Sequence, residues 1–114
     1  MMLVREALLN AYQLNGNSAT ITGIFVMKND LAYIVGTEDG VENLREAIGV
    51  DVANLKKILL AKVPAYGGSQ FSYRDEAEIT GVLMTSSERQ FPCIMAQVER
   101  LVIYKYGEPI LAIP

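Results

Sequence analysis

The side chains that most often do chemistry in proteins are scarce in this sequence. The 114 residues include no histidine and a single cysteine, Cys93. Without histidine the chain lacks the usual general base at neutral pH, the partner of serine and cysteine nucleophiles, and the commonest transition-metal ligand. Cys93 follows Pro92 among apolar residues, whereas a reactive thiol needs an electropositive and accessible setting, so we expect a buried structural thiol. The sequence therefore predicts a protein that is not an enzyme and holds no cofactor.

Acidic residues gather in two groups, and neither group has the pattern of a catalytic or metal site. In the group around Asp75, the alternation of a strand places Glu76 and Glu78 on a solvent face beside Arg74, which does not suit a pair of hydrolytic carboxylates. The other group lacks the glycine position and the odd-numbered oxygen ligands of a calcium loop. It consists of Glu38, Asp39, Glu42 and Glu46. We predict no metal site, and an acidic surface patch at this second group.

The composition favours a small globular protein with little affinity for polyanions. Hydrophobic residues make up 51% of the chain, which is enough to build one core without disulfides or metal, and we expect one domain over residues 1–114. Ten basic residues against thirteen acidic ones leave a net charge of -3, so nucleic acid is an unfavourable partner. We see no basic leader before an apolar run, and no uncharged apolar run near the ~18 residues of a membrane helix. The chain is therefore expected to be cytoplasmic.

Hydrophobic periodicity predicts one helix followed by a series of strands. Val4, Leu8, Ala11 and Tyr12 recur at helical spacing and indicate a short amphipathic helix within residues 1–15. The expected strands cover residues 18–27, 31–35, 48–50, 71–83 and 91–106.

Three connecting segments remain to be assigned. A second helix is expected between the third and fourth strands, with Asp51 as its cap. The acidic stretch 36–47 is compatible with a loop or with a loose helical turn. The tail over residues 107–114 either stays irregular or adds an edge strand.

The motif Ile-Thr-Gly followed by three apolar residues occurs twice, at residues 21–26 and 79–84. In each copy the outer face of the strand becomes apolar after the glycine, which is Gly23 or Gly81. A glycine inside a strand commonly marks a bulge or a sharp bend, and a bent strand can close a small sheet on itself. The last long strand also shifts its apolar side across residues 99–100, as a bulge would cause. We predict structural bends at Gly23 and Gly81 and a closed sheet.

The order strand, strand, short strand, helix, strand, strand over residues 18–106 resembles that of the oligonucleotide/oligosaccharide-binding fold, the OB-fold. The resemblance implies a mainly β, α+β fold: a five-stranded barrel, closed or partly open, with a helix between strands three and four and an added N-terminal helix. It also implies that the first and fourth strands lie side by side, which would make Gly23 and Gly81 neighbouring bends. A different α+β domain of five or six strands is the alternative.

The OB-fold resemblance also implies a groove over the second and third strands that binds single-stranded nucleic acid or oligosaccharide through aromatic and basic side chains. At these positions the sequence offers Lys28, Tyr33 and Arg89. One aromatic ring and two cations make a poor platform, and Tyr33 in a five-residue strand also fits a core position. Nucleic-acid or sugar binding is therefore the alternative function.

Protein recognition is the function that the composition favours. The six tyrosines and three phenylalanines suit interfaces, and an acidic patch would steer a basic partner. A general similarity to small bacterial immunity-type proteins, which bind toxins, implies the same class of function. We predict a non-enzymatic binding module that contacts another protein, in the manner of an immunity or adaptor protein, and we leave self-association open. The predicted contact residues are Tyr33, Glu38, Asp39, Glu42 and Glu46.

Overall fold

The computed structural model describes residues 1–65, 67, 69–86 and 90–114, and the chain is mainly β. The strands are β1 (Met2–Leu3), β2 (Asn17–Lys28), β3 (Leu31–Val35), β4 (Ala47–Val50), β5 (Phe71–Thr85), β6 (Cys93–Lys105) and β7 (Glu108–Ile113). The helices are α1 (Val4–Leu9), α2 (Ala11–Leu14) and α3 (Leu55–Lys62). The predicted order of the main strands, with a helix between the third and the fourth of them, is confirmed.

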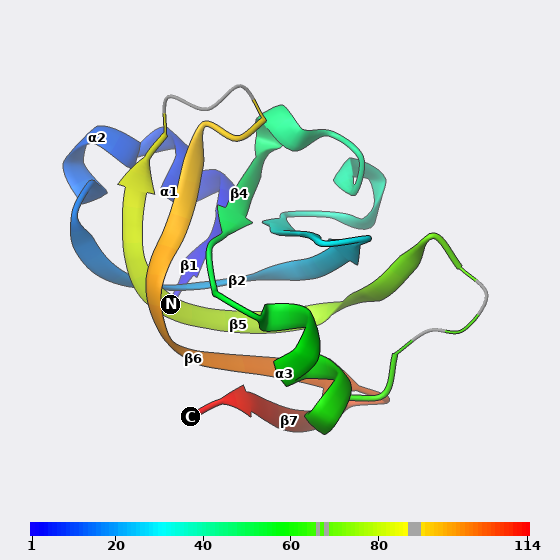
Figure 1. Cartoon of the computed structure of the whole chain (residues 1–114). Coiled ribbons are helices and arrows are strands. Elements are labelled where there is room, and N and C mark those ends of the chain that lie inside the picture. The colour runs from blue at the N-terminus through cyan, green and yellow to red at the C-terminus, as the bar shows by residue number, and fades with distance from the viewer. Residues whose placement is uncertain (66, 68, 87–89) are drawn as a thin grey trace.

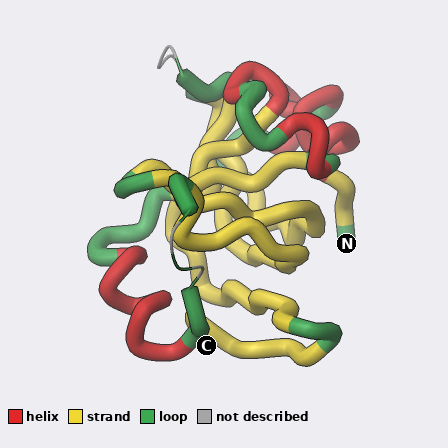
Figure 2. The backbone as a smooth tube through the Cα atoms, turned by 90° about the vertical axis from the view of Figure 1, so that its right-hand side faces the viewer, coloured by secondary structure: helices red, strands yellow, loops and turns green. Residues whose placement is uncertain are grey.

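Five of the strands form a ring of hydrogen-bonded neighbours. β2 pairs antiparallel with β3 and with β5, and β3 pairs antiparallel with β4. β6 closes the ring, since it lies parallel to β4 and antiparallel to β5. β1 and β7 are added at the edges of β2 and β6. Figures 1 and 2 show α1 and α2 at one end of this ring and α3 at the other.

The main hydrophobic core fills the ring from end to end. Ala7 of α1 and Leu59 of α3 are both fully buried and belong to the same cluster as the inward-facing strand residues. These strand residues include Ile21, Phe25, Ile79, Leu83, Met95 and Leu101. Because burial of apolar area stabilises the fold by about 25 cal/mol per Å², the helices at both ends contribute to stability by excluding water from the interior.

The N-terminal helix is not continuous, which corrects the prediction for residues 1–15. It breaks at Asn10 into α1 and α2, and the Asn10 side-chain amide donates to the Glu6 carbonyl oxygen at 2.8 Å. Because of this break, the side chains of α2 point in other directions than they would in one continuous helix. Tyr12, which the helical spacing placed in the apolar stripe, is therefore 91% exposed, whereas Val4 and Ala7 are buried.

The helix start near Asp51, the stretch 36–47 and the C-terminal tail each have a defined conformation. Asp51 does not cap a helix, because α3 begins only at Leu55, after the left-handed residue Asn54. The Asp51 backbone N–H donates to the Met95 carbonyl oxygen at 2.9 Å. The stretch 36–47 contains two short 3-10 turns and then enters β4. The tail forms the edge strand β7.

Gly23 and Gly81 lie where two backbone segments come too close to admit a side chain. A Cβ atom at Gly23 would lie 2.5 Å from the Val35 carbonyl oxygen, and one at Gly81 would lie 2.8 Å from the Ala96 carbonyl oxygen. The register of β5 against β6 shifts at Gly81, so the predicted irregularity is confirmed there. The two glycines are not neighbours, however, because Gly81 pairs with Ala19, four residues along β2 from Gly23.

The bulge predicted in the last long strand is also confirmed. Thr80 pairs with Arg100 and Val82 with Ala96, so β6 carries extra residues opposite Gly81. Gln97, within this bulge, takes a positive φ of 47°. The bulge reorients β6, so that one half of the strand pairs with β4 and the other half with β7.

Candidate functional site

A second apolar cluster lies on the outside of the ring, over β2 and β3. Alternation along β2 sends Phe25 and Met27 into the main core and Val26 to the opposite side, where it meets Tyr33 and Val35 of β3. The cluster also contains Val41, Ala47, Phe71 and Phe91. We call this region the covered face.

Phe71 belongs to the covered face although simple alternation along its strand would place it with Tyr73 in the core. The pairing of β2 with β5 explains the change. Met27 pairs with Tyr73, but the next residue, Lys28, pairs with Phe71, which leaves one extra residue in β5. This bulge turns the Phe71 ring to the outside.

The segment over residues 36–46 covers this face and is held by polar contacts. Val41 is 7% exposed, and the Tyr33 hydroxyl donates to its carbonyl oxygen. Arg74 Nε donates to Glu38 Oε2 at 2.8 Å, and Lys28 Nζ lies 3.5 Å from Glu42 Oε1. Two acidic residues of the segment, Glu38 and Glu42, thus pair with cations of β5 and β2.

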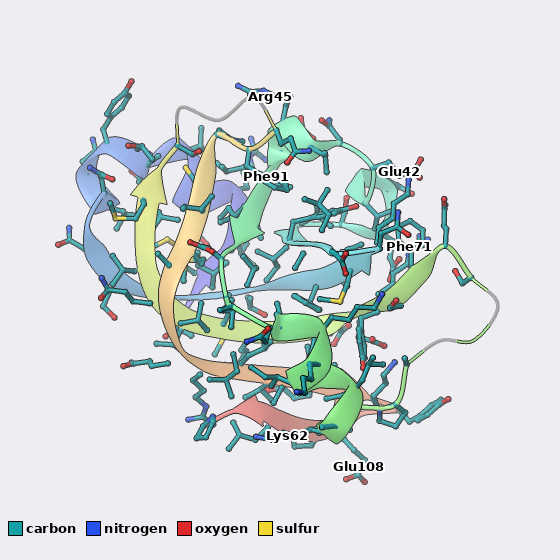
Figure 3. The ribbon with its side chains drawn as sticks, viewed as in Figure 1. Glu42, Arg45, Lys62, Phe71, Phe91 and Glu108 are labelled. Atoms are coloured by element: carbon teal, nitrogen blue, oxygen red, sulfur yellow. The ribbon has the colours of Figure 1, made fainter. Side chains whose placement is uncertain are left out.

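The same two cations frame an aromatic ring. The Arg74 guanidinium lies 5.4 Å and Lys28 Nζ 6.0 Å from the centre of the Phe71 ring. Figure 3 shows Glu42 and Phe71 at this side of the molecule, with Phe91 nearer to β4. Phe91 lies against Tyr33, with ring centres 5.8 Å apart. Burial is the main cause that raises the pKa of Tyr33, and the Glu42 carboxylate raises it further while Arg74 lowers it.

The residues predicted to contact a partner therefore differ in their surroundings: some are buried or paired within the chain, and others are exposed. Tyr33 is 1% exposed beneath the segment, and Glu38 and Glu42 are already paired within the chain. Asp39 and Glu46 are exposed. Of the residues predicted for nucleic-acid binding, Lys28 holds Glu42, Tyr33 is covered, and Arg89 lies outside the described residues. A stacking role for Tyr33 is incompatible with this burial, because its ring has no exposed face.

A groove of about 610 Å³ lies on another part of the outer surface, over β2, β5 and β6. Cross-strand neighbours form its floor. Leu3 pairs with Thr22 and Thr22 with Glu78, and in the next row Ile24 pairs with Glu76. The lining is completed by Val4, Arg5, Gly23, Gly36, Thr37, Ala77 and Tyr104. We call this region the open groove.

The polar groups of the open groove are two carboxylates and a phenol. The Tyr104 hydroxyl donates to Glu78 Oε2, and this hydrogen bond is the main cause that raises the pKa of Tyr104. Among the residues that the structure describes, no cation lies within ion-pair distance of Glu76 or Glu78. The carboxylates of the open groove are thus available to a partner, in contrast to Glu38 and Glu42.

A second groove of about 510 Å³ adjoins the first. Both grooves are lined by Val4, Arg5, Gly36 and Thr37. Large apolar side chains lie at their edges, since Leu3 is 56% and Leu9 73% exposed. Together the grooves form one surface of apolar and charged groups around the start of α1.

Cys93 and Asp75 are both buried, unlike the carboxylates of the open groove. Cys93 is 1% exposed, and burial raises the pKa of its thiol, so the predicted burial is confirmed. Asp75 points inward, unlike Glu76 and Glu78, and its Oδ2 lies 2.9 Å from Lys105 Nζ in a buried ion pair. Within the described ranges, no three histidine, cysteine, aspartate or glutamate side chains come together as metal ligands.

Comparison with protein families, with curated proteins and with solved structures yields no match for this chain. No helix in the described part of the chain is long and apolar enough to cross a membrane. The function is therefore inferred from the arrangement of side chains on the two outer regions.

Sequence reasoning missed Leu3, Thr37 and Tyr104 as functional candidates. The outward direction of Tyr104 could have been inferred from strand alternation after Ile103. Its contact with Glu78 could not, because that contact depends on the register of β5 against β6, in which Ala77 pairs with Ile103.

Proposed function

We propose that this chain is a non-enzymatic binding module, built on an OB-like barrel, that acts by contact with a basic partner protein, as an immunity or adaptor protein does. The open groove carries the proposal. It combines the exposed Leu3 and the half-buried Ile24 with two carboxylates that have no cation within ion-pair distance among the described residues. Apolar contacts supply affinity at an interface, and complementary charge supplies specificity and a faster association rate.

Two features of the fold support the OB-like barrel. The pairing of β2 with β5 corresponds to the first and fourth strands of that fold, and α3 lies between the strands that correspond to its third and fourth. The location of the apolar side chains supports protein contact, because exposed apolar residues rimmed by polar ones are typical of interaction sites.

The proposal is tested by selecting peptides from a random display library on the immobilised full chain. We expect the selected peptides to carry net positive charge. Their affinity should fall at least tenfold, or about 1.4 kcal/mol, for the variant Glu76→Lys/Glu78→Lys. The matched control is Glu99→Lys/Glu108→Lys, which changes the net charge equally at exposed positions that do not line the open groove. Peptides that bind the groove variant and the parent chain equally would contradict the proposal.

Single-stranded nucleic-acid binding is a second candidate, favoured by the two cations Lys28 and Arg74 on one face. The carboxylates of Glu38 and Glu42 occupy these cations. Fluorescence anisotropy with labelled oligo-dT at low salt tests this function. It predicts salt-sensitive binding that becomes tighter in Glu38→Gln/Glu42→Gln but not in Glu99→Gln/Glu108→Gln. Absence of binding by the parent and by both variants would eliminate this second candidate.

A further inference from the structure

We infer that the open groove recognises the guanidinium group of an arginine, presented by an extended segment of the partner protein. The inference rests on the proposed function and specifies the chemistry of the partner. It is argued from the arrangement of Glu76, Glu78 and Tyr104, the apolar floor beside them, and the absence of a cation on either carboxylate within the described residues.

The spacing of the two carboxylates fits a planar cation. Glu76 and Glu78 are separated by one residue on β5, so both project from the outer side of the strand about 7 Å apart. A guanidinium has five N–H donors in a rigid fork and can bridge two carboxylates, whereas a lysine ammonium is a compact point charge. The geometry therefore favours arginine over lysine.

Tyr104 adds a second element of recognition. Its hydroxyl donates to Glu78 Oε2, which fixes this carboxylate and leaves the other oxygen, Oε1, for a ligand. Tyr104 follows Ile103, the partner of Ala77, so its ring stands beside the two glutamates at the edge of the groove. A guanidinium stacks on aromatic faces more readily than an ammonium does.

The apolar part of the groove accommodates the rest of an arginine side chain. Ile24 pairs with Glu76, and Leu3 pairs with Thr22 at the opposite edge. Arginine covers apolar surface with its methylene groups while its charged end stays at a polar site. Arg5 also lines the groove and repels cations, so the bound guanidinium is expected at the two glutamates.

The test uses N-acetyl-arginine N-methylamide, with the citrulline and lysine derivatives as comparisons, and follows backbone amide signals of the full chain by NMR at low salt. Citrulline keeps the shape of arginine without its charge. We expect the arginine probe to shift the amides of Thr22, Gly23, Ala77 and Tyr104 with a dissociation constant on the order of 10 mM, typical of a single charge-assisted contact. Binding of the lysine probe should be about threefold weaker, and that of citrulline at least fivefold weaker.

Two single substitutions test whether the arginine probe binds in the open groove. Glu78→Gln should weaken binding of the arginine probe about fivefold, and Glu108→Gln, an exposed glutamate of β7, should leave it unchanged. Equal shifts with citrulline or lysine, or shifts confined to amides outside the groove, would overturn the inference. In that event the proposed function still stands if selected peptides lose affinity for Glu76→Lys/Glu78→Lys. If the peptides also bind this variant normally, both proposals fail.

Discussion

The covered face and the open groove are built from the same kind of strand surface, yet they differ in what lies over them. Both use side chains that point outward from β2 and β5. Over the covered face, residues 36–46 bury three aromatic rings and pair their own glutamates with Lys28 and Arg74. In the open groove only the start of this segment, Gly36 and Thr37, is part of the described lining, and Glu76 is exposed.

This difference shows which acidic residues a partner can use. In the acidic stretch 36–47, Glu38 and Glu42 form ion pairs within the chain, whereas Asp39 and Glu46 are exposed. Strand alternation alone places Glu76 and Glu78 on a solvent-exposed face. The tertiary structure adds Tyr104 beside them, and its hydroxyl donates to Glu78. The covered face should therefore contribute to stability, and the open groove to binding.

The largest expected loss of stability comes from removing a buried aromatic ring from the covered face. Phe91 is 4% exposed and its ring packs against Tyr33. Phe91→Ala should lower the free energy of unfolding by about 3–5 kcal/mol, because it removes a buried aromatic ring and leaves a cavity. Tyr104→Ala, in the open groove, should lower it by less than about 1 kcal/mol. Urea unfolding of both variants measures the difference, and equal losses would contradict the assigned roles.

Gly23 lies beneath the junction of the two regions and should be the next most sensitive position. A Cβ atom there would lie 2.5 Å from the Val35 carbonyl oxygen and 2.9 Å from Val4 Cγ2. Gly23→Ala should destabilise the protein by about 1–3 kcal/mol, since backbone has to move. The control is Gly36→Ala at the groove edge, where the nearest atom is 3.9 Å away, and where a change below about 0.5 kcal/mol is expected. Equal melting temperatures for both variants would exclude the close approach at Gly23.

A smaller loss of stability is expected when the hydroxyl of Tyr33 is removed. Tyr33→Phe removes its hydrogen bond to Val41 and should cost about 1 kcal/mol at pH 8. Burial raises the pKa of Tyr33, so the folded chain keeps a proton that the unfolded chain releases near pH 10. The stabilisation from this group is full below pH 10 and is lost as the pH rises through the raised pKa.

The stability difference between the parent chain and Tyr33→Phe should therefore narrow above pH 10. Urea unfolding of both proteins at several pH values measures it. A difference that stays constant or widens with pH would show that Tyr33 is not held protonated by its cover.

The smallest expected effect is a change in the pKa of Tyr104, in the open groove. The hydrogen bond to Glu78 is the main cause that raises the pKa of Tyr104. Glu78→Gln should lower that pKa toward the usual value of a tyrosine, because the phenol then loses its charged acceptor. Ultraviolet difference titration or NMR of the labelled tyrosine ring measures the change. In the control Glu38→Gln, at the edge of the covered face, the pKa of Tyr104 should stay as it is in the parent chain.

Much of the fold could be predicted from local sequence patterns. The turn at Lys28–Asp30 forms with Asn29 at a φ of 57°, and the alternation from Tyr73 to Leu83 matches the burial of β5. The bulge in β6 follows from the shift of its apolar side. These features depend on neighbouring residues only, since side-chain direction in a strand has a period of two.

Other features could not be predicted because they depend on pairing between distant segments. The outward turn of Phe71 requires the bulge against β2, and the exposure of Tyr12 requires the break at Asn10. Asp75 is adjacent in sequence to the solvent-facing Glu76, but it points inward and pairs with Lys105 from β6. A buried charge is acceptable only with such a partner, and the sequence does not reveal which residue supplies it.

By itself the sequence determined that this is a mainly β chain with a strand irregularity at Gly81, a buried cysteine and no histidine. These properties follow from composition and from short-range periodicity. Only the tertiary structure decided that residues 36–46 lie over Tyr33 and that Glu76, Glu78 and Tyr104 share an open groove. Contacts of this kind join residues that are far apart in the chain, and they depend on the register of whole strands, which no single segment of the sequence encodes.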